Sequence, residues 1–158
     1  MSDKLPIELD CNGERRTIAI DQRALLIEVV RDELNCPGSR IGCLTGDCGA
    51  CSVLIDGTIA KSCLVLAAAC HQREIRTIEG IRSPLLSRIQ AAFVQHKGFQ
   101  CGYCTSGMIL VAFDLLSTTP NATRDEIRNA ISGNLCRCTG YEAIIDSIEG
   151  ARDDTETD

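Results

Sequence analysis

The chain has 158 residues, 44% of them hydrophobic, and a formal net charge of −6 at pH 7. This acidic balance argues against binding to nucleic acid or to an anionic membrane surface, and no apolar stretch is long enough to span a membrane. The N-terminal residues show neither the apolar stretch of a secretory signal nor a twin-arginine motif. We therefore expect a cytoplasmic protein, in which most of the 11 cysteines are metal ligands and not disulfide partners.

The N-terminal part of the sequence predicts strands around one helix. Alternating apolar and polar residues, or short β-branched runs, indicate five strands, at residues 7–11, 16–20, 52–55, 58–62 and 75–78. Asn12-Gly13 lies between the first two and is a strong hairpin signal. An apolar stripe at helical spacing predicts a helix over residues 24–33, with Asp21 as its N-cap.

A first group of cysteines has the spacing C-x4-C-x2-C-x11-C and consists of Cys43, Cys48, Cys51 and Cys63. The first two gaps match the plant-type spacing of [2Fe–2S] clusters. The glycines of this loop, Gly42, Gly46 and Gly49, are expected to adopt positive φ, so that backbone N–H groups face the sulfurs. A zinc site would usually have two separated C-x2-C pairs, and disulfides would require an oxidising compartment. We therefore predict a [2Fe–2S] cluster in a small β-grasp, ferredoxin-like unit.

The second half of the sequence predicts helices. Helical signals, which include an N-cap Ser83 before Pro84 and a capping box at Thr123, indicate four helices, starting near residues 84, 107, 124 and 141. We place a domain boundary near residue 80, which gives an α+β chain with a ferredoxin-like domain at 1–80 and an all-α four-helix domain at 81–150. Residues 151–158 are polar and acidic, and we expect them to form an unstructured tail.

A second group of cysteines lies in the helical half, where each pair precedes a predicted helix. Its spacing is C-x2-C-x31-C-x1-C, and its members are Cys101, Cys104, Cys136 and Cys138. The spacing alone allows either a second iron–sulfur cluster or a zinc ion with four cysteine ligands. The three remaining cysteines, Cys11, Cys36 and Cys70, are expected to be small buried hydrophobic residues.

The sequence contains no Ser/His/Asp set, phosphate-binding Walker loop or GxGxxG motif, so we predict no catalytic residue. Two redox centres without a substrate-binding motif indicate an electron carrier. The chain resembles the small iron–sulfur subunit of molybdenum hydroxylases, the xanthine dehydrogenase family. The matching stretches are residues 42–51, Ser62-Cys63, 77–80, 90–93, 100–105 and 133–141, in the order that the family has them.

This resemblance implies that the second site also holds a [2Fe–2S] cluster. It implies a large partner subunit with molybdenum on a pterin dinucleotide, a medium partner subunit with FAD, and assembly as a dimer of heterotrimers. Electrons would pass from the pterin through the two clusters to FAD or to an external acceptor. By position, Gln100 and Cys138 would lie against the pterin. One departure is Ser106, where the family usually has proline. The alternative function is a free-standing two-cluster ferredoxin.

Overall fold

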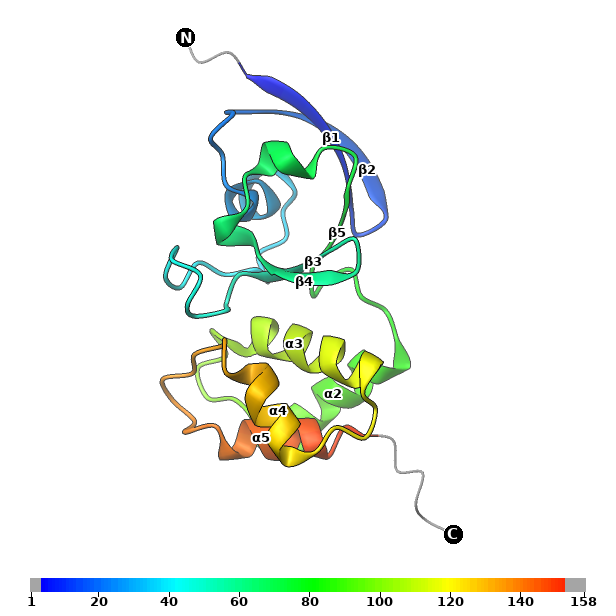
Figure 1. Ribbon diagram of the computed structural model, residues 1–158, viewed down its shortest axis with the longest axis vertical. Coiled ribbons are helices and arrows are strands. Elements are labelled where there is room, and N and C mark those ends of the chain that lie inside the picture. The colour runs from blue at the N-terminus through cyan, green and yellow to red at the C-terminus, as the bar shows by residue number, and fades with distance from the viewer. Residues whose placement is uncertain (1–3, 153–158) are drawn as a thin grey trace.

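The computed structural model describes residues 4–152 and places a β-sheet beside a group of helices (Figure 1). The strands are β1 (Leu5–Cys11), β2 (Glu14–Ile20), β3 (Ser52–Ile55), β4 (Thr58–Lys61) and β5 (Glu74–Arg76). The helices are α1 (Leu26–Glu28), α2 (Pro84–Gln95), α3 (Thr105–Thr118), α4 (Arg124–Ile131) and α5 (Glu142–Glu149). A π-helical turn covers Val29–Glu33, and 3₁₀ turns cover Ser62–Leu64 and Ala67–Cys70. The prediction of a mixed α+β fold is confirmed.

The five strands form one mixed sheet with the order β2-β1-β5-β3-β4. β1 and β5 run parallel, whereas the other neighbours are antiparallel. The predicted hairpin between β1 and β2 is confirmed, and Asn12 and Gly13 at its turn have φ values of 57° and 84°. These positive values at both central residues are those of the tight turns that suit twisted hairpins.

The helix that was expected over residues 24–33 starts later than predicted, and Asp21 is not its N-cap. Leu25 is extended, with φ −77° and ψ 147°, because it forms an isolated antiparallel bridge with Leu66. The helix therefore begins at Leu26, and the Glu28 carboxylate accepts the Leu25 N–H at 2.8 Å. The Asp21 carboxylate instead accepts the N–H of Arg23 at 2.8 Å.

The helix starts in the second half follow local capping chemistry. Ser83 Oγ accepts the Leu86 N–H at 3.1 Å before α2, and Thr123 forms the predicted capping box with Glu126 before α4. At the far end, Ala151 is buried and Arg152 donates to the Ala122 carbonyl at 2.9 Å. The rest of the expected tail, residues 153–158, lies outside the described residues.

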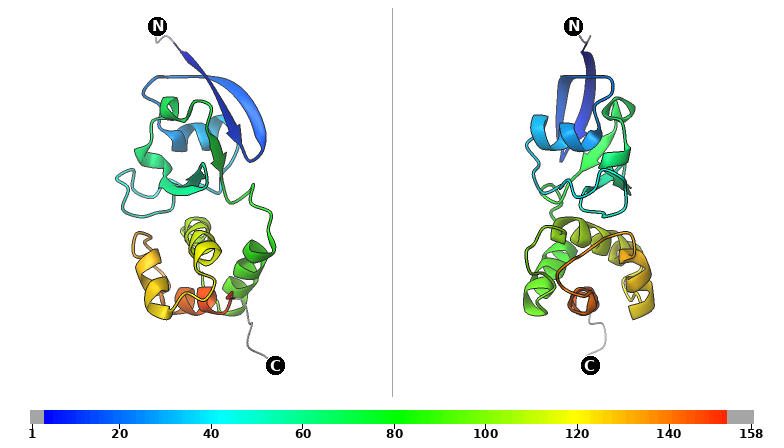
Figure 2. Two further views of the ribbon diagram at one scale, coloured as in Figure 1. Left: turned by 45° about the vertical axis from the view of Figure 1, so that its right-hand side comes forward. Right: turned by 90° about the vertical axis from the view of Figure 1, so that its left-hand side faces the viewer.

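Two hydrophobic clusters account for most of the core. One lies between the sheet and the segments of residues 26–36 and 67–70, and the other lies among α2, α3, α4 and α5. The two meet where α3 packs against β3 and β4 (Figure 2), and Leu54 of β3 belongs to the helical cluster. Within residues 4–152, none of the helices combines the length and the apolar character that crossing a membrane would require.

Candidate metal centres at the junction of sheet and helices

The first four cysteines lie on the 42–51 loop and on the turn after β4, and they approach one another in two pairs. In one pair, the backbone N–H of Cys48 lies 3.5 Å from Cys43 Sγ. In the other pair, burial and a sulfur–sulfur hydrogen bond with Cys51 raise the pKa of the Cys63 thiol to about 11. The Ser62 hydroxyl, which donates to the Cys51 carbonyl at 2.6 Å, holds this second pair together.

Hydrogen-bond donors face the sulfur atoms of the first loop. The Thr45 N–H lies 3.4 Å from Cys43 Sγ. The Thr45 side chain and the amides of Cys48 and Thr45 together lower the pKa of the Cys43 thiol to about 6. Donors that favour the thiolate over the thiol are what a metal-binding cysteine needs, because the thiolate is the ligand.

The glycines of this loop have two different roles. Gly46 and Gly49 have φ values of 85° and 68°, as expected, so the chain curls there in a way that favours glycine. Gly42 does not have positive φ, and that prediction was wrong. Its role is steric, because a Cβ atom at Gly42 would lie 2.6 Å from Cys48 Sγ.

The second four cysteines come from two segments, one leading into α3 and the other between α4 and α5. They form two pairs, each of which joins these segments. Cys138 Sγ lies 3.6 Å from Cys101 Sγ. Burial and a hydrogen bond with the Cys136 sulfur raise the pKa of the Cys104 thiol to about 12. The Thr139 hydroxyl donates to Cys136 Sγ at 3.1 Å. Each pair therefore joins one cysteine from the first segment to one from the second.

This arrangement in pairs fits a two-iron cluster better than a single ion. A [2Fe–2S] cluster takes four cysteine thiolates, two on each iron. The paired sulfurs, the donors that face them and the steric limit at Gly42 together match the ligand requirements of two such clusters.

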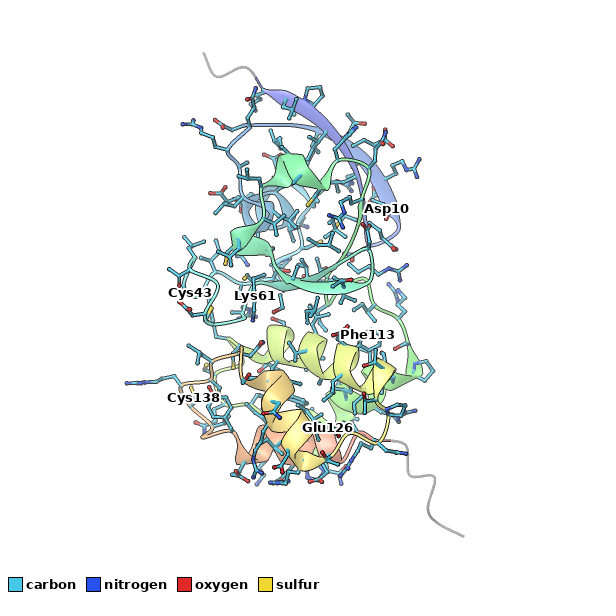
Figure 3. All side chains as sticks on the ribbon, in the orientation of Figure 1. Asp10, Cys43, Lys61, Phe113, Glu126 and Cys138 are labelled. Atoms are coloured by element: carbon cyan, nitrogen blue, oxygen red, sulfur yellow. The ribbon has the colours of Figure 1, made fainter. Side chains whose placement is uncertain are left out.

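The two cysteine loops touch each other directly. The N–H of Leu135 donates to the Cys48 carbonyl at 2.9 Å, and Asn134 Nδ2 donates to the Gly49 carbonyl at 3.3 Å. Lys61 Nζ, from β4, donates to Gly133 O at 2.6 Å and to Asn134 Oδ1 at 3.1 Å. Cys43, Lys61 and Cys138 accordingly lie toward the same edge of the molecule (Figure 3).

The contacts of Lys61 and Asn134 were not predicted from the sequence, because they join segments more than 70 residues apart. Close packing completes the contact between the loops. A Cβ atom at Gly107, in the first turn of α3, would lie only 2.2 Å from the Gly49 carbonyl oxygen. The first turn of α3 can therefore approach the first cysteine loop only with glycine at this position.

The three cysteines outside the two groups were expected to be buried. Cys11, Cys36 and Cys70 are buried, with 6%, 7% and 0% of their surface exposed. Their expected burial is therefore confirmed. Gln100, which directly precedes Cys101, is exposed, and its Nε2 donates to the Cys138 carbonyl at 3.1 Å.

Comparisons with known proteins agree with this chemistry. A family model described as a [2Fe-2S] binding domain matches residues 77–149. The chain is 44% identical over 147 residues to the nicotine 6-hydroxylase small subunit of Paenarthrobacter nicotinovorans, with 93% of this chain and 89% of that one covered. It is 43% identical over 164 residues to the aldehyde oxidoreductase iron-sulfur-binding subunit PaoA of Escherichia coli K12, with 93% and 71% covered.

A solved structure shows the same fold. The crystal structure of quinoline 2-oxidoreductase from Pseudomonas putida 86 contains a chain that superposes with a TM-score of 0.88. The sequence identity is 41%, and the match covers 95% of each chain. The likeness therefore extends over both cysteine groups.

Proposed function

The chain belongs to the small iron–sulfur subunits of molybdenum hydroxylases, the xanthine dehydrogenase family, and we propose that it carries electrons between the other subunits of such an oxidoreductase. The observation that carries this proposal is the presence of two four-cysteine groups, each arranged in pairs, on loops that share hydrogen bonds. In this proposal the chain provides the sites for electron carriers, whereas the partner subunits oxidise the substrate.

We assign one [2Fe–2S] cluster to each cysteine group. The first is held by Cys43, Cys48, Cys51 and Cys63, and the second by Cys101, Cys104, Cys136 and Cys138. In this proposal residues 1–80 form a β-grasp, ferredoxin-like domain and residues 81–150 form a four-helix domain. The separate hydrophobic clusters of the two halves support this division.

When bound, these clusters supply one-electron carriers between molybdopterin in the large subunit and FAD in the medium subunit, or an external acceptor. The residues of this chain hold the thiolates in pairs and direct donors at them. Thr45 does so at Cys43, and Thr139 does so at Cys136. Hydrogen bonds to cluster sulfurs are one of the factors that set reduction potential.

The pterin of the large subunit would meet this chain at Gln100 and Cys138. Both residues are exposed, and the Gln100 amide is bonded to the Cys138 backbone, so the two present one small polar surface. The second cluster would accordingly face the large subunit, and the first would face the FAD subunit.

Exposed apolar side chains near both cysteine groups favour a permanent subunit over a free ferredoxin. They include Leu44 and Leu64 beside the first group and Phe99 and Leu135 beside the second, with exposed fractions of 49%, 62%, 41% and 55%. A freely diffusing carrier would need only a small polar docking face, whereas permanent interfaces bury apolar surface. Assembly as a cytoplasmic dimer of heterotrimers completes the proposal.

Purification of the natively expressed, affinity-tagged chain tests this function. We expect it to elute with a large and a medium subunit and with molybdenum, FAD and iron. A chain that elutes alone with four irons and still passes electrons to several acceptors would favour the free ferredoxin instead.

A further inference from the structure

Two hydroxyl groups on either side of Cys104 reach across to the segment that leads into Cys43. Tyr103 Oη donates to the Ile41 carbonyl at 2.8 Å, and Ser106 Oγ donates to the Gly38 carbonyl at 2.5 Å. We refer to Tyr103 and Ser106 as the hydroxyl clamp. Both donors belong to the segment that carries Cys101 and Cys104, and both acceptors belong to the segment that carries Cys43.

The clamped segment depends on such donors because it lies in no helix or strand. Arg31 Nη1 donates to the carbonyls of Pro37 and Ser39, at 2.9 and 2.6 Å. This arginine comes from the same half of the chain as the segment. The Gly38 and Ile41 carbonyls are instead held from the helical half, by the clamp. The entry into the first cysteine loop is therefore fixed to both halves.

The ring of Tyr103 is itself held in place. The Arg40 guanidinium carbon lies 5.2 Å from the ring centroid, within the range of a cation–π contact. The backbone N–H of Arg40 donates to the Ala50 carbonyl at 2.9 Å, which anchors the arginine to the first cysteine loop. The contact therefore restricts the ring and directs its hydroxyl at Ile41.

The junction also has contacts that do not involve the clamp. Lys61 donates to the Asn134 side chain, Asn134 donates to the Gly49 carbonyl, and Gly107 in the first turn of α3 packs against the same carbonyl. Loss of the clamp would leave these contacts in place. The first loop could then shift relative to the second without separation of the two halves.

We propose that the hydroxyl clamp is a positioning pair that sets the distance and orientation between the two cluster sites. The inference rests on the function proposed above, since it concerns transfer between the same two sites.

The test uses the holo-complex with the double variant Tyr103→Phe plus Ser106→Ala, in which only the two hydroxyls are lost. Ser117→Ala is the matched control, because the Ser117 hydroxyl bonds within α3, to Phe113 O, away from the junction. Two readouts are combined: the magnetic splitting between the two reduced clusters in EPR spectra, and amide hydrogen exchange over residues 38–44. The splitting reports the distance and orientation between the centres directly.

We expect the double variant to keep four irons and both EPR signals, while the splitting changes and exchange over 38–44 rises about thirtyfold, as for the loss of two typical net hydrogen bonds of about 1 kcal/mol each. The control should match the wild type. An unchanged splitting would overturn the clamp, whatever the exchange shows. If the double variant loses iron, the EPR splitting is measured in the single variants Tyr103→Phe and Ser106→Ala. An unchanged splitting in both would overturn the clamp. Absence of two cluster signals from the wild type would instead refute the proposed function.

Discussion

The backbone N–H of Leu135 donates a 2.9 Å hydrogen bond to the carbonyl of Cys48. Leu135 directly precedes Cys136, so this single bond joins Cys48 of the first cysteine group to the residue beside Cys136 of the second group. A cysteine of one loop is thus connected to a cysteine of the other through backbone and one hydrogen bond. Such a link joins the two loops through backbone atoms and adds to the side-chain contacts between them.

Asn134→Ala should weaken this junction. Asn134 is 2% exposed and binds both Gly49 and Lys61, so the substitution leaves a buried carbonyl and an ammonium group without this partner. We expect the free energy of unfolding to fall by about 1–3 kcal/mol, measured by denaturant titration. The control is Asn129→Ala, at an exposed position of α4. Equal stability of the two variants would show that the Asn134 bonds are dispensable.

Gly107→Ala should push the first turn of α3 away from the first cysteine loop. Its new methyl group would lie 2.2 Å from the Gly49 carbonyl oxygen, which is backbone and cannot rotate away. We expect a loss of about 1–3 kcal/mol of stability, typical of overpacking, together with altered EPR splitting between the clusters. Gly133→Ala is the matched control, because the nearest atom to its Cβ, Lys61 Nζ, lies at 3.5 Å. A variant with wild-type stability and splitting would contradict this close contact.

The sequence predicted the local features well and the long-range ones poorly. The Asn12-Gly13 hairpin and the Thr123 capping box depend on neighbouring residues, so short patterns reveal them. The parallel pairing of β1 with β5 and the bridge of Leu25 to Leu66 depend on distant segments, and no short pattern reports them. The same limit explains why the late helix start after Leu25 was missed.

The candidate site shows the same division. The eight paired cysteines were predicted from spacing and resemblance as the two metal-binding groups, and their assignment to clusters stays a prediction. The sequence could not show which cysteine lies next to which, as Cys101 does next to Cys138. It also could not reveal Lys61, which β4 delivers to a loop 72 residues further along the chain.

Cys48→Ser should remove only the first cluster. Cys48 contributes its sulfur and its N–H to the pair with Cys43, so the variant should retain two irons and one EPR signal. Substrate should still reduce the second cluster, whereas electrons should no longer reach FAD. Iron analysis and anaerobic reduction of the complex provide the measurement. Normal turnover with the external acceptor would show that the two sites do not act in series.

Single replacement of Cys11, Cys36 or Cys70 by Ala should leave all four irons in place. These cysteines are buried, and Cys36 accepts a hydrogen bond from Asn12 Nδ2 at 3.4 Å, so we expect only a loss of about 1 kcal/mol in stability. Iron content and thermal unfolding of each variant check this. Iron loss in any one of them would mean that the ligand assignment is wrong.

Gln100→Ala should slow the reduction of the clusters by substrate in the assembled complex. The Gln100 amide holds the backbone of Cys138, and both face the proposed pterin contact. Stopped-flow bleaching of cluster absorbance under anaerobic conditions measures the rate, with iron content as the check that both clusters remain. A bleaching rate equal to that of the wild type would place Gln100 off the electron route.

The most direct measurement is metal analysis combined with EPR of the reduced, natively purified protein. Two cysteine groups with different spacing and different surroundings predict four irons per chain and two rhombic signals with different relaxation. Zinc in either site, or only two irons in a fully loaded preparation, would contradict the assignment of two [2Fe–2S] clusters.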